Sequence, residues 1–484
     1  MSDIKQSDLW IGGKHVKPSS GKYFDDLNPL DDSLYSRVAE ATAGDMNTAV
    51  ETAHKAFLAN KHWLAKDREV WFMKAASLVE RDFQEYVDIL IDEVGSPRGK
   101  AEFEVAYCIS ALRAAAGVPR NLRGDIIPSD NPGVFSMAIR EPVGVVAAIS
   151  PFNVPLLKAS KQGAMPLACG NAVVLLPSEF SSQVSLRFAQ TLHEAGVPAG
   201  LFNVVTGNPF EIGDVLTTHK KVSSITFCGS PRVGTHVAEL AAKDLKPVTL
   251  ELGGKSPLIV LNDADLDEAV QAAAMGTFFF QGQACMASSR IYLQRGIAEE
   301  FTEKFVAAAA GAGMGDLRSM DTFVGPIISE RQRERVRRHI ADATSKGVKV
   351  LAGGEWDGNR CQPTILSGVT EAMEVYRDET FGPVTSLYIF DTVDEAMEQA
   401  NDTVYGLSFS IFTRDIDTAL DMAHRAESGA VHINRPTIQD EPCPPFGGQG
   451  LSGSGREGTE ADLDILTEWK WITIRMGKRA QAGQ

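Results

Sequence analysis

Between about residues 143 and 254, short apolar β-rich runs alternate with helical patterns, and this alternation constrains the fold more than any other feature. The strand-like runs are VGVVAAISP, NAVVLLPSE, LFNVVTG, SSITFCGS and PVTLELGG, and the helical segments are PLLKASKQGAMPLA and SSQVSLRFAQTLHEAG. Near-continuous apolar strands separated by helices are typical of a parallel sheet that helices bury on both faces. The pattern therefore predicts an α/β, Rossmann-like layer, with Gly196 ending the second helix.

A second alternating series begins near residue 262. Its predicted strands include SRIYLQ, VKVLAGG, TSLYIFD and LSFSIFT, and DIDTALDMAHRAESG is a predicted helix that Gly429 ends. Two further stretches, at about 124–142 and in LDILTEWKWITIRMG, alternate apolar and polar residues as half-buried antiparallel strands do. We therefore expect two α/β domains with two antiparallel ribbons, and a frayed C-terminal KRAQAGQ.

Charge and cysteine content exclude several classes of protein. Asp and Glu outnumber Lys and Arg by 63 to 47, so no sequence-wide positive field exists to hold nucleic acid or anionic lipid. No segment approaches the roughly 18 apolar residues of a membrane helix, and MSDIKQSDLWIGGK contains no apolar signal core, so we expect a cytoplasmic protein. The six cysteines lack CxxC and Cys/His spacing, which predicts reduced thiols and no metal site.

Two residues are candidates for covalent chemistry. Glu251 lies between a β-rich run and a glycine pair in VTLELGGKSP, and Cys285 follows in FFFQGQACMASSR. A cysteine can form an acyl-enzyme, and a carboxylate can activate the water that cleaves it. Each residue alone is more often structural, since a free cysteine behaves as a small buried hydrophobe and a strand-end glutamate is commonly solvated. Their combination favours catalysis.

Together the two segments resemble the aldehyde dehydrogenase superfamily. Further motifs in the family's order extend the resemblance over about residues 8–475: SPFNVPL, VVLLPSE, VVTGNPFEIG, FCGSPRVG, DETFGPV and HINRPTIQDEPCPPFGGQGLSGSGREG. The resemblance implies an NAD-binding domain at 1–123 and 143–252 and a catalytic domain at 253–450. It also implies a small bridging β-sheet from 124–142 and 464–478 that joins subunits of a homodimer or homotetramer. Two ribbons packed on their own domain remain the alternative.

The resemblance also implies roles for individual residues. Cys285 would add to the aldehyde and form a thioester after hydride transfer, Asn153 would stabilise the oxyanion, and Glu251 would activate the hydrolytic water. Without the resemblance, Asn153 would be interpreted as an Asx turn before Pro155. Lys255 is either a surface charge or part of a proton path.

No GxGxxG fingerprint follows the first strand, so the cofactor site is inferred from the other motifs. Ser230 is placed to cap a helix whose backbone N–H groups can receive a pyrophosphate. Glu179 falls where a carboxylate receives ribose hydroxyls and would repel a 2′-phosphate, so the predicted cofactor is NAD. In the VVLLPSE motif, Leu176 stands where the family usually has a lysine, so one expected hydrogen-bond donor to the ribose is absent. The predicted cofactor-binding residues are Ser150, Pro151, Phe152, Ser178, Glu179, Gly207, Gly229, Ser230, Val233, Leu252, Glu379 and Phe381.

The segment VHINRPTIQDEP followed by PFGGQG most resembles the benzaldehyde and vanillin dehydrogenase branch, which predicts an aromatic aldehyde as substrate. The predicted substrate contacts are Phe152, Phe280, His432 and Gln439. Two alternatives stay open: oxidation of aliphatic aldehydes or semialdehydes, and a cofactor-independent cysteine acyl hydrolase. Glu179 and Glu379 argue against the hydrolase, and Glu251 argues against a CoA-acylating branch, which typically lacks that glutamate.

Overall fold

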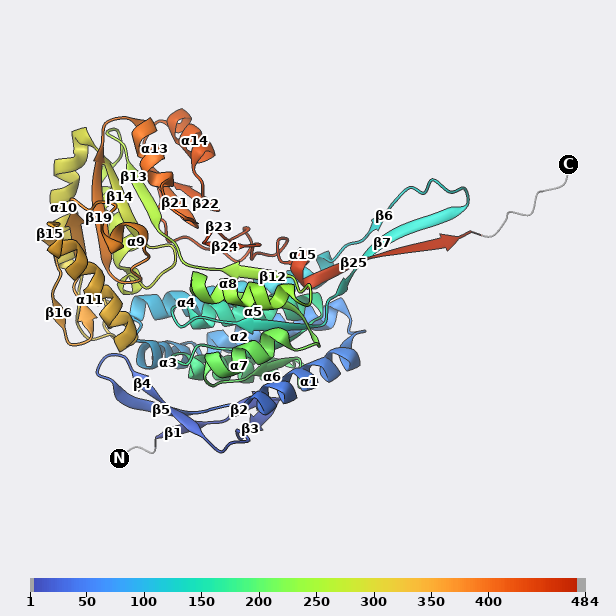
Figure 1. The fold of residues 1–484 in the computed structure, drawn as a ribbon. Coiled ribbons are helices and arrows are strands. Elements are labelled where there is room, and N and C mark those ends of the chain that lie inside the picture. The colour runs from blue at the N-terminus through green and yellow to red at the C-terminus, as the bar shows by residue number, and fades with distance from the viewer. Residues whose placement is uncertain (1–3, 477–484) are drawn as a thin grey trace.

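The computed structural model describes residues 4–476, which form two large sheets flanked by helices and one projecting arm (Figure 1). The predicted frayed tail and the end of the predicted 464–478 strand lie outside the described residues. No helix among residues 4–476 is long and apolar enough to cross a membrane.

The first sheet has eight strands in the order β24-β12-β11-β8-β9-β10-β2-β3. Its strands are β2 Leu9–Ile11, β3 Lys14–Val16, β8 Val145–Ile149, β9 Ala172–Leu176, β10 Phe202–Val204, β11 Val222–Cys228, β12 Val248–Glu251 and β24 Gly453–Ser454. The five central strands, β12 to β10, are parallel and coincide with the five predicted apolar runs. Every side chain of β9 is buried, as a parallel strand between two helical layers requires.

Helices cover both faces of the first sheet (Figure 1). They are α1 Ala43–Asn60, α2 Ala65–Arg81, α3 Phe83–Val94, α4 Arg98–Asn121, α5 Pro155–Cys169, α6 Ser182–Ala195, α7 Pro209–Thr218 and α8 Pro231–Ala242. The predicted stop at Gly196 is confirmed: this residue has φ 103° and its N–H closes the last turn of α6.

The strand order reverses beside β8. From β8 the chain proceeds outward to β9 and β10, and it then returns to add β11 and β12 on the other side of β8. Because these strands are parallel, the loops that follow β8 and β11 leave the same edge of the sheet. Ligands of open α/β sheets bind at such a reversal point, at the carboxyl ends of the strands.

The second sheet has seven strands in the order β15-β18-β19-β14-β13-β21-β22. Its strands are β13 Ser256–Val260, β14 Ser288–Gln294, β15 Lys349–Ala352, β18 Thr364–Ser367, β19 Val384–Phe390, β21 Ser408–Phe412 and β22 Ala430–Ile433. Its helices are α9 Leu266–Phe278, α10 Ala298–Gly311, α11 Glu330–Ser345, α12 Glu374–Arg377, α13 Val393–Asn401 and α14 Ile416–Arg425, with short 3₁₀ turns η1 Phe279–Gly282 and η2 Arg295–Ile297.

Two predictions for the second half were wrong. The series starts with β13 at Ser256, not near 262, because Pro257 lies inside that strand at a register shift and weakens the strand pattern. The helix α14 ends at Arg425, so Gly429 does not stop it. Gly429 is instead a point of close approach, where a Cβ would lie 1.7 Å from the carbonyl oxygen of Gly447.

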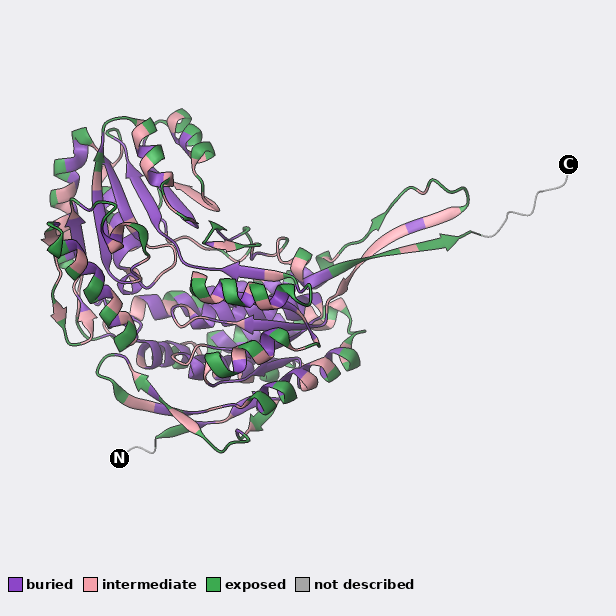
Figure 2. Ribbon diagram, in the orientation of Figure 1, coloured by how far each residue is buried: buried purple, intermediate pink, exposed green. Residues whose placement is uncertain are grey.

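The two predicted ribbons form one sheet. The strands β6 Asp125–Ile126, β7 Val134–Pro142 and β25 Thr467–Arg475 pair in the order β25-β7-β6, and β25 follows the short helix α15 Leu463–Leu466. This sheet, called the arm below, extends away from the body of the chain (Figure 1), so the two ribbons are not packed on their own domain. Most of its residues are exposed or half-buried, whereas the central strands of the two large sheets are buried (Figure 2).

The remaining strands form small sheets. A three-stranded sheet near the N-terminus consists of β1 Lys5–Ser7, β4 Tyr23–Asn28 and β5 Ser33–Ala39, and two-stranded pairs are formed by β16 Trp356–Asp357 with β17 Arg360–Cys361 and by β20 Tyr405–Gly406 with β23 Gln449–Gly450.

Candidate active site

Asn153 lies in the loop between β8 and α5, at the reversal point of the first sheet. Its side chain is buried, and its Nδ2 donates a hydrogen bond to the carbonyl oxygen of Gln283, at 2.9 Å. This contact joins residues 130 positions apart, and no nearby N–H among the described residues donates to Asn153 Oδ1, so the Asx turn considered as the alternative does not form. A carboxamide carries two N–H donors, and the second forms no hydrogen bond within residues 4–476.

The segment leading to Cys285 has an unusual backbone. Phe280 and Gln281 both adopt left-handed conformations, with φ of 48° and 49°. Such conformations in non-glycine residues each cost about 1–3 kcal/mol and persist only where the surroundings fix them. The buried Gln281 side chain supplies this fixation, since it donates to the carbonyl of Pro326 at 2.8 Å and accepts from the N–H of Gly325 at 3.0 Å. Cys285, which follows this turn, is half-buried.

Glu251 ends β12, and its side chain is 2 % exposed. Its Oε1 has no hydrogen-bond partner among the described residues. Glycines allow close approach on two sides: a Cβ at Gly447 would lie 2.7 Å from Glu251 Oε1, and one at Gly254 would lie 2.3 Å from the carbonyl oxygen of Cys285. The glycine pair after Glu251 therefore brings the carboxylate strand against the thiol segment.

Burial disfavours the ionised forms of both groups. Burial raises the pKa of Glu251 well above its usual range, and the Lys158 ammonium opposes this shift. Burial likewise raises the pKa of the Cys285 thiol, the neighbouring Cys228 adds to the rise, and Lys158 again opposes it. Lys158 is thus a cation that favours the ionised, reactive form of both groups.

Sequence reasoning missed a buried group of charges beside this pair. Lys158 Nζ lies 2.7 Å from Glu457 Oε2, and Lys161 Nζ lies 3.2 Å from both carboxylate oxygens of Asp440. Although burial alone lowers the pKa of Lys158, the Glu457 carboxylate raises it well above its usual range. The available signal was two lysines, three positions apart, in a largely apolar helix shortly after Asn153, because buried lysines require partners.

The predicted nicotinamide-side residues lie near this pair. Glu379 Oε1 accepts a hydrogen bond from the N–H of Gly254 at 2.9 Å, and burial raises its pKa to about 7. Phe152 contacts Phe381 edge to face, with ring centroids 5.9 Å apart. Lys255 is buried, donates to the carbonyl of Asp378 at 2.7 Å and has its pKa lowered by burial to about 7, so the surface-charge interpretation of Lys255 was wrong.

Other predicted cofactor residues flank the reversal point. Ser230 occupies the N-cap position of α8, as predicted, but its side chain makes no capping hydrogen bond. The Ser150 hydroxyl, next to Pro151, is buried and has no partner among the described residues. Glu179 is half-buried and accepts only from Ser178 Oγ, at 3.2 Å, within residues 4–476.

Three further predicted cofactor positions are close-packed. Gly207 is buried with φ +151°, and a Cβ there would lie 3.0 Å from the backbone nitrogen of Ala41. Leu252 fills the space beside Gly234 on α8, one position after the half-buried Val233, and Gly229 lies just before that helix. Leu176, in place of the family lysine, is fully buried, and its carbonyl accepts from the N–H of Ser150 at 3.1 Å.

The predicted substrate contacts have diverse surroundings. Phe280 is 2 % exposed, and the Lys100 ammonium lies 4.1 Å from its ring centroid, so it is packed as a core residue. His432 is half-buried on β22, with an Nε2 that has no partner among the described residues. Gln439 accepts from Arg435 at 2.7 Å. The half-buried Phe279, which was not predicted as a contact, has a partly open ring.

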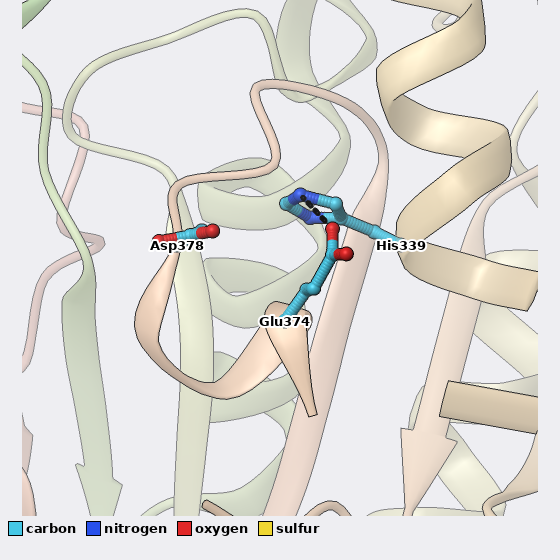
Figure 3. Close-up of side chains that lie close together, drawn as sticks. All are labelled: His339, Glu374 and Asp378. Atoms are coloured by element: carbon cyan, nitrogen blue, oxygen red, sulfur yellow. Dashed lines mark ion pairs between the residues drawn. The ribbon is translucent and has the colours of Figure 1, made fainter. Parts of the chain in front are cut away.

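One side-chain group within the described residues has the composition of a metal site: His339, Glu374 and Asp378, whose ligand atoms lie within 4.8 Å of one another (Figure 3). Positively charged side chains already surround this group. Arg338 Nε lies 2.8 Å from a Glu374 oxygen, and burial, then Lys255 and arginines including Arg338, lower the pKa of His339 to about 3. The positive surroundings disfavour a further cation, so we assign no metal to this group.

Comparison with known proteins reveals extensive similarity. The model of the family described as "Aldehyde dehydrogenase family" matches residues 15–472. A vanillin dehydrogenase of Pseudomonas fluorescens is 40 % identical over 474 residues, which cover 97 % of this chain and 98 % of that protein. A benzaldehyde dehydrogenase [NAD(+)] of Pseudomonas putida is 36 % identical over 482 residues, which cover 98 % of each chain.

A similar fold occurs among solved structures. The crystal structure of a salicylaldehyde dehydrogenase from Pseudomonas putida G7, complexed with salicylaldehyde, superposes with a TM-score of 0.95 at 37 % identity. The match covers 99 % of this chain and 100 % of that one. The predicted α/β architecture with a small additional sheet is therefore confirmed.

Proposed function

The chain belongs to the aldehyde dehydrogenase family, whose members use a nicotinamide cofactor, and from this we propose that it oxidises an aromatic aldehyde of the benzaldehyde or vanillin kind to the carboxylic acid with NAD. The observation that carries the chemistry is the approach of two reactive segments. Gly254, three positions after the buried Glu251, packs against the backbone of Cys285. The names of the similar proteins support the aromatic substrate.

The residues at the reversal point fit a nicotinamide dinucleotide. The buried Ser150 hydroxyl has no partner within the described residues, and the loop after β11 leads directly into α8, whose first N–H groups suit a pyrophosphate. Glu179 would receive the ribose hydroxyls, and Glu379 and Phe381 would hold the nicotinamide end. The bound cofactor supplies the acceptor for the hydride that leaves the aldehyde carbon.

The first half of the reaction uses Cys285 and Asn153. The Cys285 thiol first loses its proton, and the thiolate, which the Lys158 ammonium favours, adds to the aldehyde carbon; this makes that carbon tetrahedral and places negative charge on its oxygen. Gln283 fixes the Asn153 amide through one N–H, so the other N–H can donate to this oxygen without reorganisation. The first half leaves the acyl group on Cys285 as a thioester.

The second half uses Glu251. Its ionised carboxylate takes a proton from water as the water oxygen attacks the thioester carbon, and the acid and the free thiol are released. Because burial raises the pKa of Glu251, this carboxylate is a stronger base than an exposed glutamate. Its Oε1 has no hydrogen-bond partner among the described residues and is therefore available to accept from this water.

Of the two alternatives, only the hydrolase is disfavoured by particular residues. A cysteine acyl hydrolase needs a general base near the thiol but no acceptor for hydride. It would therefore have no need of residues that could hold a nicotinamide cofactor, such as Glu379, Phe381 and the β11–α8 loop. Oxidation of aliphatic aldehydes or semialdehydes uses the same chemistry as the proposed reaction. It differs only in the group beside the reacting carbon, and the substrate panel described below distinguishes it.

We further propose that the arm joins subunits of a homodimer or homotetramer. The arm carries large exposed apolar side chains, including Ile126 at 75 %, Trp469 at 50 % and Trp471 at 73 % exposure. Apolar groups gathered on a projecting, unsupported sheet mark a contact surface. The outer edge of β25 pairs with no other strand in residues 4–476, which leaves it open to a partner strand.

The test is a panel of aldehydes assayed with NAD and with NADP, with reduced nicotinamide as the readout. We expect higher kcat/KM for benzaldehyde and its hydroxylated derivatives than for acetaldehyde and succinate semialdehyde, and higher efficiency with NAD than with NADP. Higher efficiency with the aliphatic aldehydes would overturn the aromatic assignment, and equal use of NADP would overturn the role of Glu179.

A further inference from the structure

One face of α5 begins next to Asn153 and carries the residues of interest. Val154 caps this helix, and Leu157 and Lys161 follow at the spacing that places side chains on the same face. Val154 and Leu157 pack with Tyr107 and Ala111 of α4 in a small apolar cluster that is separate from the main cores. This cluster therefore adjoins the residue proposed to bind the aldehyde oxygen.

Tyr107 is the polar member of this cluster. The residue is 6 % exposed, and its hydroxyl has no hydrogen-bond partner among the described residues. Burial, and next the Asp440 carboxylate, raise the pKa of Tyr107, so the phenol is neutral and can donate. A buried hydroxyl without a partner is unfavourable unless a ligand satisfies it.

Aromatic rings connect Tyr107 with the surface. The Phe103 ring, 43 % exposed, lies 6.2 Å from the Tyr107 ring and 6.0 Å from that of the half-buried Phe279. Flat ring faces and edges of this kind favour an aromatic ligand through offset or edge-to-face contacts.

Ion pairs between buried lysines and carboxylates lie next to Tyr107. Lys161 Nζ lies 6.0 Å from the Tyr107 ring centroid, 3.2 Å from Asp440 and 3.6 Å from Glu457, and Lys158 also pairs with Glu457. The two ammonium groups thus face two carboxylates. No positive charge of this group is left unmatched to receive a carboxylate-bearing substrate, whereas Asp440 can still accept a hydrogen bond.

Resting on the proposed function, we propose that Tyr107 and the Lys161–Asp440 pair recognise a hydroxyl group on the ring of the aromatic aldehyde. A phenolic hydroxyl both donates and accepts. It can donate to the Asp440 carboxylate and accept from the Tyr107 hydroxyl. Unsubstituted benzaldehyde leaves the Tyr107 hydroxyl without a partner, and an anionic ring substituent is repelled by Asp440 and Glu457. The chain is therefore specific for phenolic aldehydes.

The experiment compares benzaldehyde with 2-, 3- and 4-hydroxybenzaldehyde and with 4-carboxybenzaldehyde, all with saturating NAD. We expect at least one hydroxylated isomer to exceed benzaldehyde about tenfold in kcat/KM, and 4-carboxybenzaldehyde to be the poorest substrate. In Tyr107→Phe and in Asp440→Asn the preference for the hydroxylated isomer should fall about tenfold, mainly through KM, as expected for one lost hydrogen bond.

The matched control is Tyr86→Phe. Tyr86 is likewise buried, but its hydroxyl pairs with Thr191 Oγ1 at 2.7 Å. This variant should lose stability and keep the wild-type preference, whereas Tyr107→Phe should lose the preference without a lower melting temperature. Equal kcat/KM for benzaldehyde and every hydroxylated isomer in the wild type, or an unchanged preference in both Tyr107→Phe and Asp440→Asn, would overturn the inference. If no benzaldehyde were oxidised while aliphatic aldehydes were, the proposed function itself would fail.

Discussion

Replacing Glu251 with Gln should separate the two halves of the proposed reaction. Glutamine has the shape of glutamate and fits the buried position beside Gly447, but it cannot take a proton from water. Addition of Cys285 and loss of hydride do not use this carboxylate. Hydrolysis of the thioester does, and a general base contributes about a hundred- to ten-thousandfold to such a step.

Rapid mixing of Glu251→Gln with benzaldehyde and NAD tests this separation. We expect a burst of about one NADH per active site, followed by a steady state about a hundred- to ten-thousandfold slower than that of the wild type. A wild-type steady-state rate would show that another group is the base. Loss of the burst, with thiol reactivity and NAD binding retained, would show that Glu251 is needed before the thioester forms.

The same substitution has a consequence for stability, with a defined sign. A carboxyl group whose folded-state pKa is raised contributes stability below its unfolded pKa of about 4.3, and this contribution is lost as the pH rises through the folded pKa. Glutamine does not titrate, so the melting temperature of Glu251→Gln relative to wild type should rise as the pH rises above the unfolded pKa of about 4.3 toward the raised folded-state pKa. The rate at which the wild type hydrolyses the thioester should also increase with pH, because Glu251 must be ionised to act as the base. A stability difference that does not change with pH would contradict the assigned burial effect.

The other predictions concern the nucleophile, the oxyanion donor and the arm. Cys285→Ala should abolish aldehyde oxidation while NAD binding, measured by calorimetry, is retained; substantial turnover would refute the mechanism. Asn153→Ala should lower kcat about a hundred- to a thousandfold, and a loss confined to KM would argue against an oxyanion role. Ile126→Glu combined with Trp471→Glu, at positions 75 % and 73 % exposed, should shift the molar mass measured by light scattering toward that of the monomer, and an unchanged mass would exclude the arm as the contact.

The first sheet could be predicted in detail because its strands are buried on both faces. Each central strand is then a nearly continuous apolar run, and glycines such as Gly170 and Gly196 end the intervening helices with φ of 97° and 103°. The second sheet was less predictable where local rules compete with tertiary structure. Pro257 lies within a buried strand, and Gly429 is required by a neighbouring backbone rather than by the helix before it.

The predicted catalytic residues rested on motifs, whereas their electrostatic partners are set by the fold. Lys158 pairs with Glu457 and Lys161 with Asp440, at separations of 299 and 279 residues. No local pattern specifies such partners. The lysines in an apolar helix signalled that partners must exist, but only the packing of α5 against the loop around Phe446 identifies them.

These buried charges explain why the motif glycines accompany the reactive groups. A carboxylate removed from water, such as Glu251, is costly to ionise, and the nearby Lys158 ammonium offsets part of that cost. The offset requires the strand that carries Glu251, the thiol segment and the segment that carries Gly447 to approach more closely than side chains permit. Gly254 and Gly447 provide this approach, since a Cβ on either would lie 2.7 Å or less from a site atom. The glycines of these motifs therefore position the reactive groups that the motifs identify.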